Sequence, residues 1–159
     1  MPHVEPNKQL WLGRVLDEHE ELRRSLDEFR GFLSSPRPDV GATGCHTWAS
    51  ECATRLVELH EKLFRHFRFE EYEGMLHDLS EAHPRVIPQV EEIEREHPEM
   101  LESLRNIVGD VLVYSEGLPP EDSRIRRRIT EVLDRLVSHE QREMDLIQHA
   151  FYRDIGAGD

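Results

Sequence analysis

Four long stretches of this sequence repeat apolar side chains at intervals of three and four residues, the period of one face of an α-helix. They span approximately residues 8–33, 44–80, 84–115 and 122–154. No segment alternates apolar and polar residues as a half-buried strand would. The connections between the stretches are short and contain proline. The pattern therefore predicts an all-α chain, folded as an antiparallel up-down-up-down four-helix bundle.

Length and charge restrict the class of protein further. The 159 residues make one domain of ordinary size, which we take to cover 1–159. A formal net charge of −13 opposes binding to a phosphate backbone, so we expect no nucleic-acid partner. The one basic run, Arg124 and 126–128, is interpreted as a solvated helix face. The sequence names no protein partner.

Targeting signals and cysteines indicate a reducing compartment. The first residues carry neither a basic region nor an apolar run, and no stretch is long and apolar enough to span a membrane. Cys45 and Cys52 lie two turns apart on one predicted helix, about 10 Å, which is beyond the reach of a disulfide. We expect both to be buried and reduced, and the protein to be cytoplasmic.

Each apolar stripe is interrupted by polar residues at positions where its period requires an apolar one. Helix 8–33 carries a histidine there, and so does helix 84–115. Helices 44–80 and 122–154 each carry a histidine with a glutamate one turn later, in a His-x-x-x-Glu motif. The six residues are His19, His66, Glu70, His97, His139 and Glu143.

Two carboxylates buried among leucines need compensation, because an unpaired buried charge costs several kcal/mol at least. A metal ion would supply it. Imidazole and carboxylate together suit iron, manganese or zinc, and iron is favoured where carboxylates bridge two ions. Two His-x-x-x-Glu pairs on different helices can chelate two metals with the glutamates between them. The competing interpretation is a network of core histidines, each satisfied by a glutamate, without metal.

Connection lengths place the six residues at one level of the bundle. Counted from the turns, His66 matches His97, and His97 matches His139. His19 matches only if helix 44–80 extends about 12 Å beyond helix 8–33. His77 would then lie about 10 Å beyond Glu70, and we assign it with His3, His46, His60, His83 and His149 to the surface or the bundle ends.

These motifs resemble the hemerythrin-like, or HHE cation-binding, family. The resemblance runs from about Leu10 to Phe151 and rests on His19, the segment 66–70, Glu96-His97 and the segment 139–143. It implies a non-haem di-iron centre with Glu70 and Glu143 as bridges. The four histidines would be terminal ligands. Members of this family bind dioxygen reversibly, sense oxygen or iron, or meet peroxide and nitric oxide.

The chain departs from the oxygen-carrying hemerythrins at two places. They have a further histidine one turn before the position of His97, where this chain has Ile93. Six protein ligands in place of seven leave another coordination position open, which favours reaction or sensing over simple carriage. Glu94 or Glu96 would compensate only in part. Pro98 removes the amide that would bond to Glu94 and predicts a kink.

Other site classes fit less well. Ferritin-like di-iron oxidases need Glu-x-x-His on two helices, and only Glu94/His97 provides it. The zinc-protease motif His-Glu-x-x-His is absent. No catalytic residues are identified. We predict a protein that binds or senses dioxygen, peroxide or nitric oxide at two iron ions, with manganese or zinc as substitutes. The alternatives are an iron-responsive regulatory module and a structural bundle without metal.

Overall fold

The computed structural model describes residues 6–34, 42–115 and 123–156, and within these ranges every regular element is a helix. The side chains of residues 6–10, 42–47, 114–115, 123 and 151–156 are outside the description. The elements in chain order are α1 (Pro6–Ser34), α2 (Ala42–Tyr72), α3 (Met75–Ala82), the 3-10 helix η1 (Pro84–Val86), α4 (Ile87–Ser115) and α5 (Ser123–Gly156).

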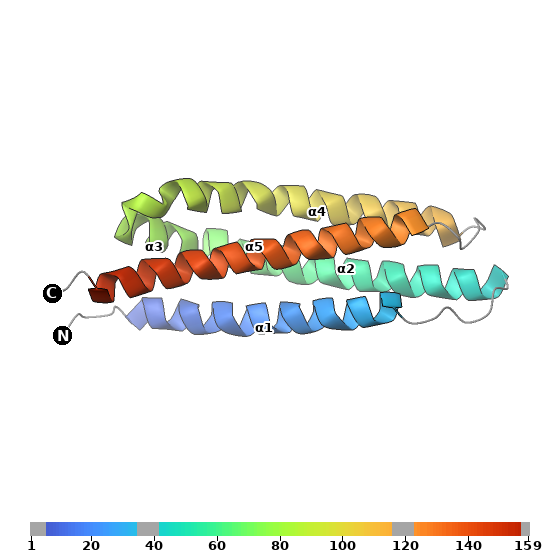
Figure 1. Cartoon of the computed structure of the whole chain (residues 1–159), viewed down its shortest axis with the longest axis horizontal. Coiled ribbons are helices and arrows are strands. Elements are labelled where there is room, and N and C mark those ends of the chain that lie inside the picture. The colour runs from blue at the N-terminus through green and yellow to red at the C-terminus, as the bar shows by residue number, and fades with distance from the viewer. Residues whose placement is uncertain (1–5, 35–41, 116–122, 157–159) are drawn as a thin grey trace.

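The four long helices α1, α2, α4 and α5 lie side by side, with both chain termini at the same end (Figure 1). Around the bundle, contacts join α1 to α2, α2 to α4, α4 to α5, and α5 back to α1. The predicted all-α antiparallel bundle is confirmed. In Figure 1, α2 also extends past the end of α1, as the connection lengths required.

The prediction of one helix over 44–80 is wrong, because the helix breaks at Gly74. This glycine has a φ of 95°, a left-handed conformation that other residues adopt only at a cost. The amide of Glu73 still bonds to the Phe69 carbonyl at 3.1 Å, and the amide of Asp78 begins α3 by bonding to the Gly74 carbonyl at 2.8 Å. The chain therefore turns after α2, and α3 packs against the end of the bundle near the termini.

Two further boundaries refine the expectations. The segment predicted as one helix over 84–115 begins with the 3-10 turn η1, which Pro84 opens, and continues as α4. Pro98 lies inside α4 without ending it.

The predictions about cysteines and membrane spans can be compared with the described residues. Cys52 is buried and free, whereas the side chain of Cys45 lies outside the described residues. Among the described helices, none has the length and apolar character to cross a membrane.

The hydrophobic core consists of two clusters separated by a polar layer. The larger cluster fills the half of the bundle distant from the termini, with Leu22, Leu63, Met100 and Leu136 at its edge. The smaller one, at the α3 end, joins α3 to residues of all four long helices. It consists of Trp11, Val15, Phe69, Met75, Leu76, Leu79, Val90, Ile93, Leu146, Ile147 and Ala150. On α1, α4 and α5 a buried histidine lies between the residues of the two clusters, and on α2 the buried His66 lies beside Phe67, where the larger cluster ends.

Candidate metal centre

The polar layer is made of the six residues that interrupt the apolar stripes. His19 comes from α1, His97 from α4, and the pairs His66/Glu70 and His139/Glu143 from α2 and α5. Each of the six is at most 4% exposed. The helical period that buries the leucines also buries these side chains, since they occupy the same face. The structure thus brings together every residue that the sequence singled out.

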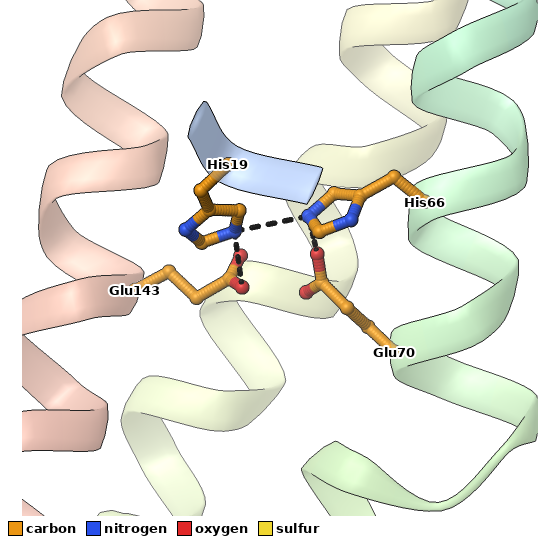
Figure 2. A group of neighbouring side chains, drawn as sticks. All are labelled: His19, His66, Glu70 and Glu143. Carbon is orange, nitrogen blue, oxygen red and sulfur yellow. Dashed lines mark hydrogen bonds and ion pairs between the residues drawn. The ribbon is translucent and has the colours of Figure 1, made fainter. Parts of the chain in front are cut away.

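The donor atoms form two overlapping groups. Within the first, which consists of His19, His66, Glu70 and Glu143, the donor atoms lie within 4.8 Å of one another (Figure 2). The second consists of His97, His139 and Glu143 with the same spacing. Glu143 belongs to both groups. In the first, the Nε2 atoms of His19 and His66 are 3.0 Å apart and point toward one another.

Each carboxylate lies between the histidine pair His19/His66 and the histidine pair His97/His139. Glu143 places Oε1 3.1 Å from His19 Nε2 and Oε2 3.5 Å from His139 Nε2. Glu70 places Oε1 against His66 Nε2 and Oε2 3.8 Å from His97 Nε2. One oxygen of each carboxylate therefore faces each histidine pair, which is the arrangement that a carboxylate bridge between two cations needs.

Most of these donor atoms have no hydrogen bond. Both oxygens of Glu70 and of Glu143, together with Nε2 of His97 and of His139, are buried without a hydrogen-bond partner among the described residues. A buried polar atom without a hydrogen bond costs about 1–3 kcal/mol, and more when it is charged. Divalent cations would satisfy all of them at once. The donor set therefore fits a metal.

Without metal, the two buried carboxylates of the site repel each other. Burial and the charge of Glu143 hold the pKa of Glu70 well above its usual range. Burial also raises the pKa of Glu143, but His139 and His19 outweigh it and keep the pKa below the usual range. The pKa values of the two neighbouring carboxyls are thus shifted in opposite directions. A dication beside both would favour the charged form of each.

The pKa values of two of the histidines are shifted in opposite directions. Burial, with the charge of His139, lowers the pKa of His97 to about 3, so that its ring is neutral and available as a ligand. Burial also disfavours the charged form of His66, but the charge of Glu70 and the hydrogen bond to Glu18 raise its pKa to about 10. His66 must therefore release a proton before it can bind a metal.

Three carboxylates outside the six hold the histidine rings in place, a role that the sequence pattern did not predict for any of them. Glu18 lies 2.6 Å from His66 Nδ1, Glu71 lies 2.7 Å from His97 Nδ1, and Glu96 lies 2.7 Å from His139 Nδ1. A ring that donates from Nδ1 keeps the lone pair of Nε2 for a metal.

Two of these three carboxylates are anchored by arginines. Arg14 bonds to Glu18 at 3.1 Å, and Arg142 holds Glu96 with two nitrogens at 2.5 and 2.7 Å. Glu71 differs, because burial and the nearby charge of Glu94 raise its pKa. The rings of His66 and His139, one in each donor group, are therefore held by arginine-anchored carboxylates.

The remaining predictions concern residues that lie near the candidate ligands in the sequence. His77 is 69% exposed and pairs with Glu81, which confirms its place at the surface. Ile93 is buried in the smaller apolar cluster and brings no donor atom. Glu96 does not compensate for it, since its carboxylate faces His139 Nδ1 and Arg142, and Glu94 is exposed. Each donor group thus has two histidines.

Comparison with known proteins gives one match. The family model described as the Hemerythrin HHE cation binding domain matches residues 12–150, which include all six candidate ligands. No curated protein and no solved structure is similar enough to this chain to match. The family and the His/Glu cluster together indicate a cation-binding protein.

Proposed function

The chain belongs to the hemerythrin HHE cation-binding domain family, and on that premise we propose that it holds two non-haem iron ions and binds or senses dioxygen. Peroxide and nitric oxide are the related ligands. His19, His66, His97 and His139 would be terminal ligands. Glu70 and Glu143 would be the bridges.

The observation that supports the proposal is the reach of the two carboxylates. Each has one oxygen toward His19/His66 and the other toward His97/His139. A single ion would leave one oxygen of each carboxylate unpaired in the core. Two ions satisfy all four oxygens, and carboxylate bridging with imidazole ligands favours iron. Manganese and zinc are the expected substitutes.

The protein holds the candidate ligands in position and excludes water from the polar layer. Glu18, Glu71 and Glu96 fix the ring orientation of three histidines, as described above. The apolar clusters on both sides of the layer keep bulk water out. When bound, the iron pair supplies redox chemistry and open coordination positions. Because Ile93 gives no ligand, each donor group would offer an ion two histidines and leave positions open, which favours reaction or sensing over simple carriage.

The test is elemental analysis of protein expressed with iron, joined to an absorption spectrum before and after air is admitted. About two irons per chain and a spectrum that changes on oxygenation would support the proposal. Protein that melts cooperatively without metal and takes up no added iron would contradict it. The six residues would then be a buried His/Glu network in a structural bundle.

A second function, that of an iron-responsive regulatory module, is favoured because the candidate ligands come from all four long helices. The six side chains come from α1, α2, α4 and α5, so that bound metal would tie all four helices together. Metal that binds only the folded chain stabilises it. This function predicts a large metal-dependent rise in Tm and a change in binding to a partner, without a spectral response to dioxygen.

A further inference from the structure

A surface groove lies between α2 and α4, beside the candidate metal centre. Its volume is about 760 Å³, and its walls include Phe64, Tyr72, Pro98 and Leu101. Phe64 and Tyr72 are exposed, whereas Phe67 and His97, which also line the groove, are buried. The buried pair therefore forms its floor. The groove leads from solvent directly to one candidate ligand.

A second, much smaller cavity lies inside the bundle. It measures about 10 Å³, close to the smallest volume that holds one water molecule. Five leucines line it, namely Leu22, Leu26, Leu59, Leu63 and Leu136, together with Phe67, Glu140 and two candidate ligands, His66 and His139. Its surface is apolar where it is accessible. It reaches the metal layer from the side of the larger apolar cluster.

Among the described residues, Phe67 alone lines both the groove and the cavity. Its ring stacks on His97, with centroids 3.9 Å apart and an interplanar angle of 5°. It also meets the edge of His139 at 5.7 Å and lies 6.0 Å from His66. The side chain is buried and separates solvent-accessible space from the apolar space beside the ligands.

We propose that Phe67 controls which molecules reach the metal centre, admitting small uncharged ones from the α2/α4 groove into the leucine-lined cavity. This inference rests on the proposed function, since it assigns the entry route for the dioxygen, or other diatomic ligand, of that site. Phe67 acts through position and does not bind the metal.

The surroundings of Phe67 explain the selection by size and charge. The cavity is so small that only molecules near the size of water or dioxygen pass without displacing leucines. An ion would lose most of its hydration among those leucines. Glu71 and Glu94 line the groove together with one cation, Arg68, and the excess of negative charge further disfavours anions at its mouth. Rotation of the Phe67 ring away from His97 opens the route.

The test varies the size of residue 67 in the full chain. Phe67→Leu should open the route and Phe67→Trp should close it, with Phe67→Met as a second opening variant in case the tryptophan does not fold. Phe29→Leu is the matched control, because Phe29 is equally buried in the core but lines neither the groove nor the cavity. Melting curves and metal content verify that each variant is folded and loaded.

Two measurements are compared. In the iron-loaded, reduced chain, stopped-flow mixing gives the association rate of nitric oxide. In the zinc-loaded chain, which is diamagnetic, dissolved dioxygen accelerates relaxation of the methyl protons it meets. The cavity methyls of Leu63 and Leu136 are compared with those of Leu104, a buried residue that does not line the cavity.

We expect the association rate of nitric oxide and the relaxation rate of the cavity methyls both to decrease in the order Phe67→Leu, wild type, Phe67→Trp. The fastest and slowest variants should differ about tenfold, and Phe29→Leu should equal the wild type. Equal rates at all sizes of residue 67, or an equal effect of the control, would overturn the proposal. If the chain binds no metal, the proposed function fails. The methyl relaxation in the metal-free chain then still decides whether residue 67 controls passage.

Discussion

Replacing Glu96 by glutamine should weaken metal binding about 10- to 100-fold, although Glu96 is not itself a candidate ligand. Its carboxylate lies 2.7 Å from His139 Nδ1 and accepts two bonds from Arg142 at 2.5 and 2.7 Å. A glutamine keeps the shape but loses the charge, and its single acceptor oxygen cannot serve His139 and both arginine nitrogens. The expected loss corresponds to about 1.4–2.7 kcal/mol of binding free energy.

The assay is a competition titration of zinc or iron(II) against a chromophoric chelator, performed on Glu96→Gln and on a control variant. Glu99→Gln is the control, since Glu99 lies on the same helix, is exposed, and has its ion-pair nitrogen, from Arg135, at 3.7 Å. It should change the affinity by less than about twofold, because such surface pairs contribute little. Equal affinities for the two variants, with both helical, would refute the orienting role of Glu96.

Three further perturbations test other features. Glu143→Gln should sharply lower metal content while the chain stays helical, because a neutral amide bridges two cations poorly; elemental analysis checks this, with His77→Ala as the unaffected control. In the metal-free chain, the pKa of His66 is about 10 compared with 6.5 in the unfolded chain, so folding favours its protonated form. The free energy of unfolding should therefore fall by a few kcal/mol as the pH rises from 6.5 to about 10, and urea titrations at both ends of this range would detect it. Gly74→Ala should destabilise the chain by about 1–2 kcal/mol, because φ is positive there, whereas Gly13→Ala, with no neighbour near the new methyl group, should stabilise it by about 0.5–1 kcal/mol; thermal melts distinguish the two.

The bundle and its polar layer were predictable because both follow from one helical period. Where the period requires a leucine and the sequence has His19 or His97, the side chain must be buried whatever the details of packing. The same reasoning brings Glu70 and Glu143 inward, one turn after their histidines. That the six residues bind metal stays a prediction, whereas their convergence is seen in the structure.

The break at Gly74 was not predictable from periodicity, because Met75, Leu76 and Leu79 continue the apolar composition after it. A glycine is tolerated in a helix or ends one, and its backbone conformation is decided by what the next residues pack against. Here the residues of α3 are buried in the smaller core cluster. The gain from this burial lies in tertiary contacts that the local sequence does not show.

The orienting carboxylates were missed for a different reason. Glu18, Glu71 and Glu96 each stand next to a candidate ligand in the sequence, yet each bonds to a histidine of a neighbouring helix. With 33 acidic residues in the chain, a glutamate beside a histidine carries little information. Which of them faces a ring depends on how each helix is rotated about its axis, and only the packed bundle fixes that rotation.

The position of the polar layer links the two proposed functions. The layer divides the apolar core, and its donors come from all four long helices. The cost of carboxylate oxygens without hydrogen bonds therefore falls on the interface that holds the bundle together. A metal that removes this cost stabilises the fold whether or not it later meets dioxygen. A rise in Tm on loading iron is therefore expected from both functions. A spectrum that responds to dioxygen is expected only from the first, and its dependence on Phe67 would connect the response to the route through the groove.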